Sequence, residues 1–340
     1  MSLSEKLQNY AIKLAEAIHQ NNAILLLDFD GTVSPFHSDK MKAYAVEGVE
    51  NILQTIEQQY PNTVLFVTGR PKNELDFLLA RGNEHSSYIF NAICEHGCEI
   101  VIDGKSEFSY FDKMTENEKT LLSEMRQEAS RLARDFYDAN HLDKHNIQFR
   151  QIFENEKKCS FAFHWRVIEE HKDLTEEKKQ DLIAELSDKY HKFFKKHLGE
   201  SSTRNRSNDS EPFFDYQISV EVVAEVKPHK LRANKGLMSA MALQLPQYAD
   251  KKTIVFAGDD FEQGGTDAYA AKFVNSLNGE KKGTVIQVQN GKQLDSYDEG
   301  TKPTYVISNP EEMALFITAV YLHLVQLEQL AKNTPGFRKK

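Results

Sequence analysis

The stretch that decides the fold is AILLLDF at residues 23–29, an apolar run interrupted only by its aspartate. A strand with apolar side chains on both faces is typical of a parallel sheet, because helices cover both faces of such a sheet. A helical run follows at 46–59, and a second apolar strand, TVLFVT, follows at 63–68. Strands that alternate with helices in this way predict an α/β protein with a doubly wound, mostly parallel sheet.

The same alternation continues beyond residue 70 and returns near the other end of the chain. The further core elements that we expect are a helix at 73–80 and strands at 88–94, 99–102, 253–257, 284–288 and 305–307. Residues 1–107 and 227–340 are therefore predicted to form one core domain.

The middle of the chain, residues 108–226, follows a different order, in which long helices are separated by pairs of strands. The elements that we expect there are helices at 115–139 and 175–197, a hairpin of strands at 147–153 and 159–167, and a strand-rich segment at 213–226. This order predicts an α+β cap domain that is inserted into the core domain. The polar tract at 200–211, rich in Ser and Asn, predicts a mobile loop within the cap.

Length, charge and cysteine content limit the classes of function. A chain of 340 residues has room for two domains at roughly 100–200 residues each. Its net charge of −9 argues against nucleic acid or an anionic membrane as the main partner, because both would repel it. Three scattered cysteines are too few for a disulfide framework and suit a reducing compartment.

The N-terminal sequence and the hydropathy pattern indicate where in the cell the protein is expected. Residues 1–22 have the pattern of an amphipathic helix and lack the apolar run and cleavage site of a signal peptide. No stretch approaches the ~20 apolar residues of a membrane span. We therefore expect a cytoplasmic protein without a membrane span, and the sequence leaves its oligomeric state open.

Two carboxylates stand at the end of the first buried strand, in the sequence Asp28-Phe29-Asp30-Gly31-Thr32. Residues two apart on a strand point the same way, so both aspartates can face one site. Ligands of open α/β sheets bind at the carboxyl ends of the strands. Two neighbouring buried carboxylates require a shared cation or a proton, which suits a metal ligand and a general acid.

A hydroxyl group and a lysine follow at two later points where a strand or loop leads into a helix. Thr68-Gly69-Arg70 ends the second strand, and a hydroxyl with backbone N–H groups before a helix can hold a phosphate. Lys235 lies at the entry to a helical run, from which its ammonium group can bind phosphate as a point charge.

A third apolar strand ends in Gly258-Asp259-Asp260. Magnesium prefers oxygen ligands and takes one or two carboxylates together with substrate phosphate and water. Asp28, the backbone carbonyl of Asp30, Asp259 and Asp260 are therefore the candidate ligands of a Mg²⁺ ion. Each of the four motifs alone could be structural, as an acidic turn, a Thr-Gly turn or a solvated lysine. Their occurrence in this order at four junctions favours the functional interpretation.

In this order, the motifs resemble those of the haloacid dehalogenase-like phosphatase superfamily. The resemblance implies that Asp28 is the nucleophile of a phosphatase, that Asp30 is its general acid and base, and that Thr68 and Lys235 bind the phosphate. The inserted segment looks like the cap of the subgroup that holds trehalose-6-phosphate phosphatases, sucrose phosphatases and phosphomannomutases.

Within that subgroup, further short motifs are similar to those of the trehalose-6-phosphate phosphatases. These are Thr68-Gly69-Arg70, Glu95-His96-Gly97-Cys98, His164-Trp165-Arg166, Glu225-Val226-Lys227-Pro228 and Asn234-Lys235-Gly236. The resemblance implies a sugar phosphate as the substrate, with trehalose 6-phosphate as the leading candidate. It implies contacts to that substrate from Gly69, Arg70, His164, Arg166 and Glu225, although the last three could equally be structural residues of the cap.

The sequence departs from the family pattern at two places. The family's G-D-D-x-T-D-E is interrupted by four additional residues between Phe261 and Thr266, and its final glutamate is Ala268. The arginine of E-V-R-P is Lys227, which lacks the planar fork that holds an oxygen pair. These changes leave open another sugar phosphate as substrate, a phosphomutase, or a catalytically weak binding or effector module.

Overall fold

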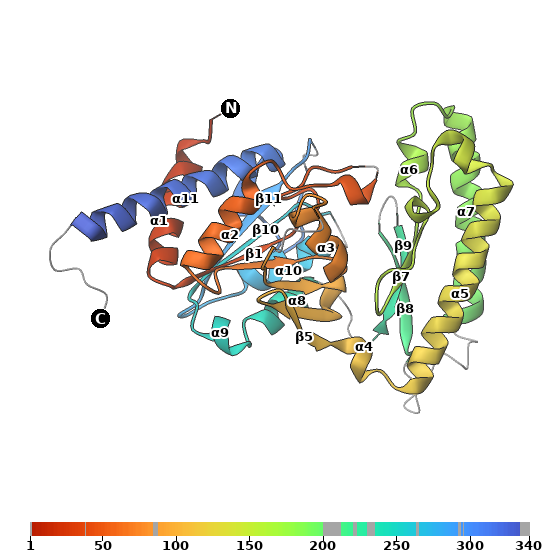
Figure 1. Ribbon diagram of the computed structural model, residues 1–340, viewed down its shortest axis with the longest axis horizontal. Helices are drawn as coiled ribbons and strands as arrows, with labels where there is room; N and C mark the ends of the chain where they lie inside the picture. The colour runs from red at the N-terminus through yellow and green to blue at the C-terminus, as the bar shows by residue number, and fades with distance from the viewer. Residues whose placement is uncertain are drawn as a thin grey trace.

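An eight-stranded sheet forms the centre of the core domain, and a separate four-stranded sheet forms the cap (Figure 1). The computed structural model describes residues 2–37, 39–83, 88–199, 212–219, 223–229, 235–262, 265–291, 294 and 296–333. The loop predicted at 200–211 lies outside these residues, as does Asn234.

The core sheet has the strand order β12-β11-β10-β1-β2-β3-β4-β5. Its strands are β1 (Ala23–Leu27), β2 (Val64–Val67), β3 (Ala92–Cys94), β4 (Glu99–Ile102), β5 (Lys105–Ser109), β10 (Thr253–Gly258), β11 (Lys282–Val288) and β12 (Tyr305–Ile307). The strands from β12 to β3 are parallel, whereas β4 and β5 continue the sheet in antiparallel pairs. The sequence did not predict β5, because its first half is polar and exposed.

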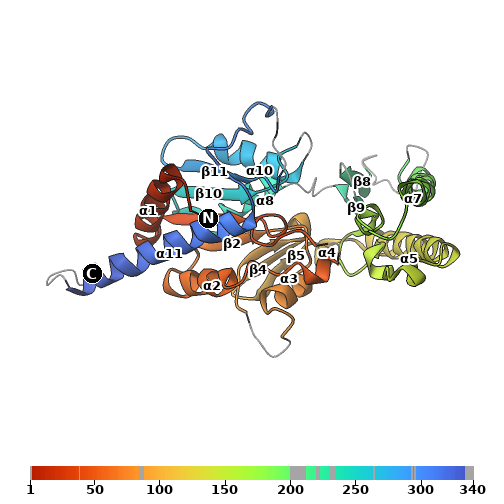
Figure 2. The ribbon, with the colours of Figure 1, turned by 90° about the horizontal axis from the view of Figure 1, so that it is seen from above.

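Helices cover both faces of this sheet (Figure 2). One face carries α1 (Glu5–His19), α2 (Val49–Gln59), α3 (Lys72–Leu79) and α11 (Pro310–Asn333), and the other carries α8 (Lys235–Ala242), α9 (Pro246–Ala249) and α10 (Thr266–Asn275). Alternate residues of β1 pack into the two hydrophobic clusters, Leu25 into one and Leu26 into the other. All five residues of β1 are buried, and the doubly wound α/β prediction is confirmed.

Helix α11 stands out by its length and hydropathy. Within the part of the chain that the structure describes, it is the one helix long and apolar enough to cross a membrane. Core helices of soluble proteins pass the same test, so this is weak evidence for a span. Met313, Phe316 and Val320 of α11 pack into the hydrophobic cluster that α1 shares.

The cap sheet has the order β6-β7-β9-β8 and is antiparallel. Its elements are α4 (Tyr110–Lys113), α5 (Glu116–Ala139), β6 (Phe153–Glu154), β7 (Phe161–His164), α6 (Arg166–Glu169), α7 (Glu176–His197), β8 (Phe214–Ser219) and β9 (Val223–Pro228). Figure 1 shows the sheet on the side toward the core and α5 and α7 on the side away from it. Thr115 caps α5 in a capping box with Glu118, and this fixes the start of the helix at Glu116.

The strand predicted at 147–153 is wrong for most of its length. One 3-10 helix, Phe149–Gln151, occupies the middle of this range, and only Phe153 at its end belongs to a strand, β6. Gln148 and Gln151 form a capping box around this helix, which prevents a continuous strand. The expected domain boundaries fall within β5 and β9, and the division at 108–226 stays a proposal.

The connection between α2 and β2 depends on one carboxylate, that of Glu57. It accepts the backbone N–H groups of Asn62 (2.6 Å), Thr63 (2.9 Å) and Val64 (2.7 Å), together with the side-chain amide of Asn91 (2.8 Å). The alternative for these donors would be to remain unpaired as the chain enters the buried sheet, which is costly. Glu57 therefore fixes the start of β2.

We expect Glu57→Ala to lower the free energy of unfolding by about 2–4 kcal/mol at pH 5, because it leaves these donors without an acceptor. Burial raises the pKa of Glu57 to about 7, so its contribution to stability is present at low pH and falls as the pH rises toward 7. Urea unfolding should therefore show a larger deficit at pH 5 than at pH 8. Glu47→Ala, at an exposed position, is the matched control, and an equal effect of both variants would contradict this role.

Candidate functional site

The predicted site residues meet at the carboxyl ends of β1, β2 and β10. A cavity of about 360 Å³ opens there. Among its lining residues are Asp28, Asp30, Thr68, Gly69, Lys235, Asp259 and Asp260. Because β1 pairs directly with β2 and β10, the loops that follow these strands lie side by side. With Arg166, which also lines this cavity, the structure brings together eight of the eleven residues that the sequence singled out.

Lys235 lies between two carboxylates at the start of α8. Its Nζ is 2.6 Å from Asp28 Oδ1 and 2.7 Å from Asp267 Oδ1, and all three side chains are buried. Although burial alone would lower the pKa of Lys235, Asp267 and Asp28 raise it above its usual value. Lys235 therefore carries its charge throughout the working pH range.

Asp267 also holds the loop after β10. Its Oδ2 accepts the backbone N–H groups of Asp259 (2.8 Å) and Asp260 (3.0 Å). Asp267 stands in the first turn of α10, directly after the segment that carries the four additional residues. The interruption of the family motif therefore leaves Asp267 at the site. The carboxylate of Asp260 binds the N–H of Thr266 (2.8 Å) instead and fixes the start of α10.

The carboxylates of this site are suited to a divalent cation. Asp28, Asp259 and Asp267 each offer one oxygen, and these oxygens lie within 4.8 Å of one another. Burial raises the pKa of Asp28 to about 7, with Lys235 opposing and Asp267 adding to the rise. Burial and the charges of Asp267 and Asp28 also raise the pKa of Asp259. One lysine does not balance so many buried carboxylates, whereas a divalent ion would.

The oxygen set that the structure groups differs from the four ligands expected from sequence. Among the side chains it includes Asp267 and leaves out Asp260, whereas Asp30 was expected to contribute its backbone carbonyl. Gly31 has a positive φ of 72°, and a Cβ there would lie 2.4 Å from Asp259 Oδ2. Glycine is thus required both by the turn and by the approach of Asp259.

The side chain of Asp30 is held by an arginine. Arg70 donates to both of its oxygens, from Nε at 2.7 Å and from Nη2 at 2.6 Å, and donates to Glu74 at 3.2 Å. Arg70 is buried, so this bidentate pair orients Asp30 closely. The substrate contact expected of Arg70 would therefore be made from a side chain that is already paired.

The Thr68 loop approaches the cavity from β2. The Thr68 hydroxyl accepts the N–H of Arg70 at 3.1 Å, and among the described residues no acceptor is found for its own hydrogen, which can be donated to a ligand. His96 packs against Gly69, where a Cβ would lie 2.7 Å from the imidazole. His96 itself has a positive φ of 54°, a strained conformation for a side chain of this size.

A second cavity of about 220 Å³ adjoins the first and lies between core and cap. The two share Asp30, Phe36, Gly69 and Arg166. The other charged or polar residues of the second cavity include Lys40, Arg70, Glu74, Arg150, Glu154, Lys157 and His164. The cavity is therefore lined by groups that can bind hydroxyls.

His164 and Arg166, which were expected to contact the substrate from the cap, lie in different elements. His164 ends β7 and lies 3.1 Å from Glu154, while Arg166 begins α6 and packs its guanidinium over the Phe36 ring at 4.8 Å. The two do not share a strand face, since β7 ends at His164.

Glu225 lines neither cavity, although it lies close to both. Its carboxylate is paired with Lys157 (2.7 Å), Ser160 (3.0 Å) and His96 (3.2 Å). It connects the cap to the core through His96 rather than facing open space.

Sequence reasoning did not assign Asp267, Asn290 or Lys40 to the site. Asn290 follows β11 and donates to the Gly31 carbonyl at 2.7 Å, and a polar residue at a strand end was the available signal. Lys40 joins Glu74 (2.5 Å) to Glu154 of the cap (2.6 Å), and no spacing in the sequence indicates this.

Comparison with known proteins agrees with the motif analysis. Residues 26–191 match the trehalose-phosphatase family, which confirms the resemblance. No curated protein sequence matches the chain.

Solved structures share the fold at low sequence identity. The C-terminal domain of Candida albicans trehalose-6-phosphate phosphatase is 15% identical, with a TM-score of 0.59, over 91% of this chain and 96% of that one. Aspergillus fumigatus trehalose-6-phosphate phosphatase is 16% identical, with a TM-score of 0.50, over 92% and 97%. A trehalose-6-phosphate phosphatase related protein is 14% identical, with a TM-score of 0.51, over 90% and 100%. At these identities the likeness shows the fold alone.

Proposed function

Because residues 26–191 match the trehalose-phosphatase family, we propose that the chain is a haloacid dehalogenase-like phosphatase that hydrolyses a sugar phosphate, with trehalose 6-phosphate as the leading candidate. A phosphoric monoester hydrolase needs a phosphate site next to a site for the leaving group. The observation that carries the proposal is the position of Asp30, which lines both cavities. One cavity holds the carboxylates and Lys235, and the other offers side chains for sugar hydroxyls.

The larger cavity is suited to hold the phosphoryl group. Thr68 can donate its hydroxyl hydrogen to a phosphate oxygen, and Lys235 can contribute a positive charge beside Asp28. Both groups would offset charge that develops on the oxygens in the transition state. Asp267 keeps Lys235 in place and so acts as a positioning residue.

In the proposed reaction, Asp28 attacks phosphorus in line with the leaving oxygen and forms an aspartyl-phosphate. Asp30 gives its proton to the leaving sugar oxygen. Asp30 then takes a proton from water, which attacks phosphorus, releases phosphate and restores Asp28. Arg70 orients Asp30 throughout, through its two hydrogen bonds.

Asp28, Asp259 and Asp267 are the residues that would hold the cation, which we propose to be Mg²⁺. When bound, it would supply positive charge that balances the carboxylates and the phosphoryl oxygens. The backbone carbonyl of Asp30 stays a proposed ligand, whereas the side chain of Asp260, which the sequence also suggested, is committed to Thr266.

The smaller cavity is the proposed sugar site. Although burial alone would raise the pKa of Glu154, Lys157 and Lys40 hold it well below its usual value, so Glu154 stays an acceptor for hydroxyls. His164 and Arg166 border the same space and are proposed to contact the sugar, with Gly69 and Arg70 on the core side. Glu225 would act on the substrate through Lys157, which it holds.

We expect Asp259→Ala to raise the Mg²⁺ concentration needed for half-maximal activity by at least about tenfold, because a ligand is lost. The measurement is a Mg²⁺ titration of phosphate release, with Glu280→Ala, exposed in the loop before β11, as control. An unchanged titration curve for Asp259→Ala would remove Asp259 from the cation site.

The proposal is tested with a panel of phosphate esters assayed for released phosphate, in Mg²⁺ and in EDTA. The panel contains trehalose 6-phosphate, sucrose 6-phosphate, glucose 6-phosphate and p-nitrophenyl phosphate. We expect kcat/KM for trehalose 6-phosphate to exceed that for glucose 6-phosphate by at least about 10²-fold, because only the former can use the whole sugar site.

Other results of this panel would favour the alternative functions. Equal rates on all esters would contradict a dedicated sugar site, and transfer of phosphate between positions of one sugar would indicate a phosphomutase. No release from any ester, with binding retained, would indicate a binding or effector module. A cytoplasmic location stays a prediction.

A further inference from the structure

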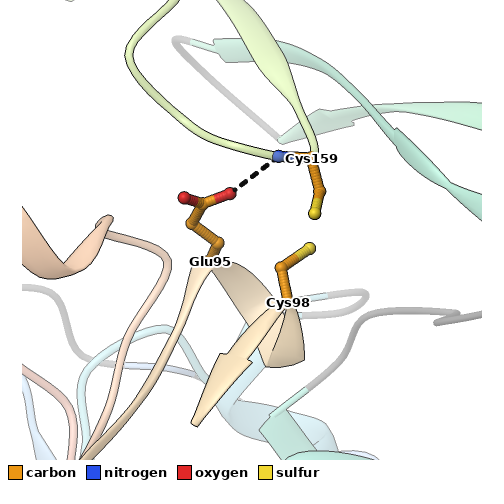
Figure 3. A group of neighbouring side chains, drawn as sticks. All are labelled: Glu95, Cys98 and Cys159. Atoms are coloured by element: carbon orange, nitrogen blue, oxygen red, sulfur yellow. Dashed lines mark hydrogen bonds between the residues drawn. The ribbon is translucent and has the colours of Figure 1, made fainter. Parts of the chain in front are cut away.

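Two thiols from the two domains lie against each other at the junction between them (Figure 3). Cys98 follows the 3-10 helix Glu95–Gly97 in the core, and Cys159 precedes β7 in the cap. Their sulfurs and one oxygen of Glu95 lie within 4.8 Å of one another, and both cysteines are buried. This cluster lines neither cavity of the proposed active site.

Fixed contacts hold the two thiols in this arrangement. Glu95 accepts the N–H groups of Lys158 (2.8 Å) and Cys159 (3.1 Å), so a core carboxylate holds the cap segment. Arg126 of α5 donates to three carbonyls of the same segment, those of Lys157, Lys158 and Ser160. The backbone around Cys159 is thereby tied from both domains.

The cluster is less suited to a metal ion than to a bond between its sulfurs. A closed structural zinc site needs four ligands, and three candidate atoms come together here among the residues that the structure describes. Both oxygens of Glu95 already accept N–H groups, and Arg126 adds a positive charge beside Glu95 and Cys159. That charge repels a cation.

We propose that Cys98 and Cys159 form a reversible disulfide that ties the cap to the core. A disulfide bond is about 2 Å long, so the sulfurs have to approach by less than about 3 Å from their present separation. Of the three cysteines, Cys94 packs in a different hydrophobic cluster, that of the core helices, and stays out of this pair.

The oxidant in the proposed reaction is a peroxide, which is small enough to reach a buried thiol. One thiolate attacks a peroxide oxygen, the O–O bond breaks, and a sulfenic acid and hydroxide form. The second thiolate then attacks the sulfenic sulfur, the S–O bond breaks, and hydroxide leaves as the S–S bond forms. In sum, two thiols and one hydrogen peroxide give one disulfide and two waters, with two electrons passing to the peroxide.

Glu95 can accept a thiol proton in this reaction. The contact with Cys159 and burial raise the pKa of the Cys98 thiol, so unassisted ionisation is unfavourable. Burial also raises the pKa of Glu95, which makes its carboxylate a better proton acceptor. In Figure 3 the two sulfurs face each other and Glu95 stands beside them, and one of its oxygens lies within 4.8 Å of both sulfurs.

The test counts thiols and locates the bond in the full chain. The protein is treated with hydrogen peroxide, unfolded in the presence of a maleimide, and analysed by mass spectrometry before and after proteolysis without reductant. We expect the three thiols to fall to one, a cross-linked peptide pair that contains Cys98 and Cys159, and recovery of three thiols with dithiothreitol. The urea midpoint should rise on oxidation and return on reduction, because the bond constrains the unfolded chain.

Cysteine-to-serine variants distinguish the Cys98–Cys159 disulfide from other oxidation products. Cys94→Ser is the matched control and should lose both of its remaining thiols, whereas Cys98→Ser and Cys159→Ser should yield no cross-linked pair. A bond that involves Cys94, or three thiols that persist, would overturn the proposal. Thiols that become oxidisable only after a chelator is added would overturn it in favour of a metal site. All readouts are independent of phosphate release, so they stand whether or not the proposed function holds.

Discussion

Asp28→Asn should lower kcat by at least about 10⁴-fold, because an amide cannot form the acyl-phosphate on which the proposed mechanism depends. The substitution keeps the size of the side chain that follows β1. Lys235 retains Asp267 as its partner at 2.7 Å, so the lysine is not left as an unpaired buried charge. Phosphate release from trehalose 6-phosphate is the direct measurement.

The fold should survive this substitution, and its stability should not fall. Asp28 lies near Asp259 and Asp267, and an amide at this position removes the repulsion of one carboxylate. Thermal unfolding checks this, with Asp188→Asn on the exposed side of α7 as the matched control. A variant that folds and retains near wild-type turnover would exclude Asp28 as the nucleophile.

Lys235→Met should have the second largest effect, about a 10³-fold loss of kcat, because the one ammonium group paired with Asp28 is removed. This variant, unlike Asp28→Asn, should also be less stable in metal-free buffer. It leaves Asp28 and Asp267 buried without their partner, at a cost of about 3–5 kcal/mol. Phosphate release and urea unfolding in EDTA measure the two effects.

Magnesium provides a second test of the same residue. A divalent ion would restore charge balance, so Mg²⁺ should recover much of the lost stability of Lys235→Met and little of its activity. Lys272→Met, at an exposed position of α10, serves as the control for loss of a lysine. A fully stable and active Lys235→Met variant would show that the ion pairs with Asp28 and Asp267 have no role.

The parts of the site that could be predicted are those that depend on strand ends. Buried apolar runs locate β1, β2 and β10, and parallel strands end at one edge, so Asp28, Thr68 and Asp259 had to meet. What could not be predicted depends on side-chain pairing over long distances in sequence. Lys40 pairs with Glu154 of the cap, and no sequence pattern around either residue indicates that the two lie close together.

Local spacing explains the remaining differences. Because four additional residues follow Phe261, Asp267 does not stand at the sequence position that the family motif predicts. In the structure, its carboxylate nevertheless pairs with Lys235. Arg70 was expected to contact substrate, but its pairing with Asp30 depends on rotamers that a sequence does not specify. In the cap, the 3-10 helix Phe149–Gln151 interrupts the segment that was predicted to be a strand.

The sheet order has a consequence for synthesis of the protein on the ribosome. Ala23 of β1 pairs with Thr253 of β10, and the whole cap lies between them in sequence. At about 5–20 residues per second, one edge of β1 stays without a partner for roughly ten to fifty seconds. The cap is continuous in sequence and has its own hydrophobic cluster, so it can fold during this interval. The nascent chain therefore exposes an apolar strand edge until Gly258 has emerged, and this is the stage at which it most needs protection from aggregation.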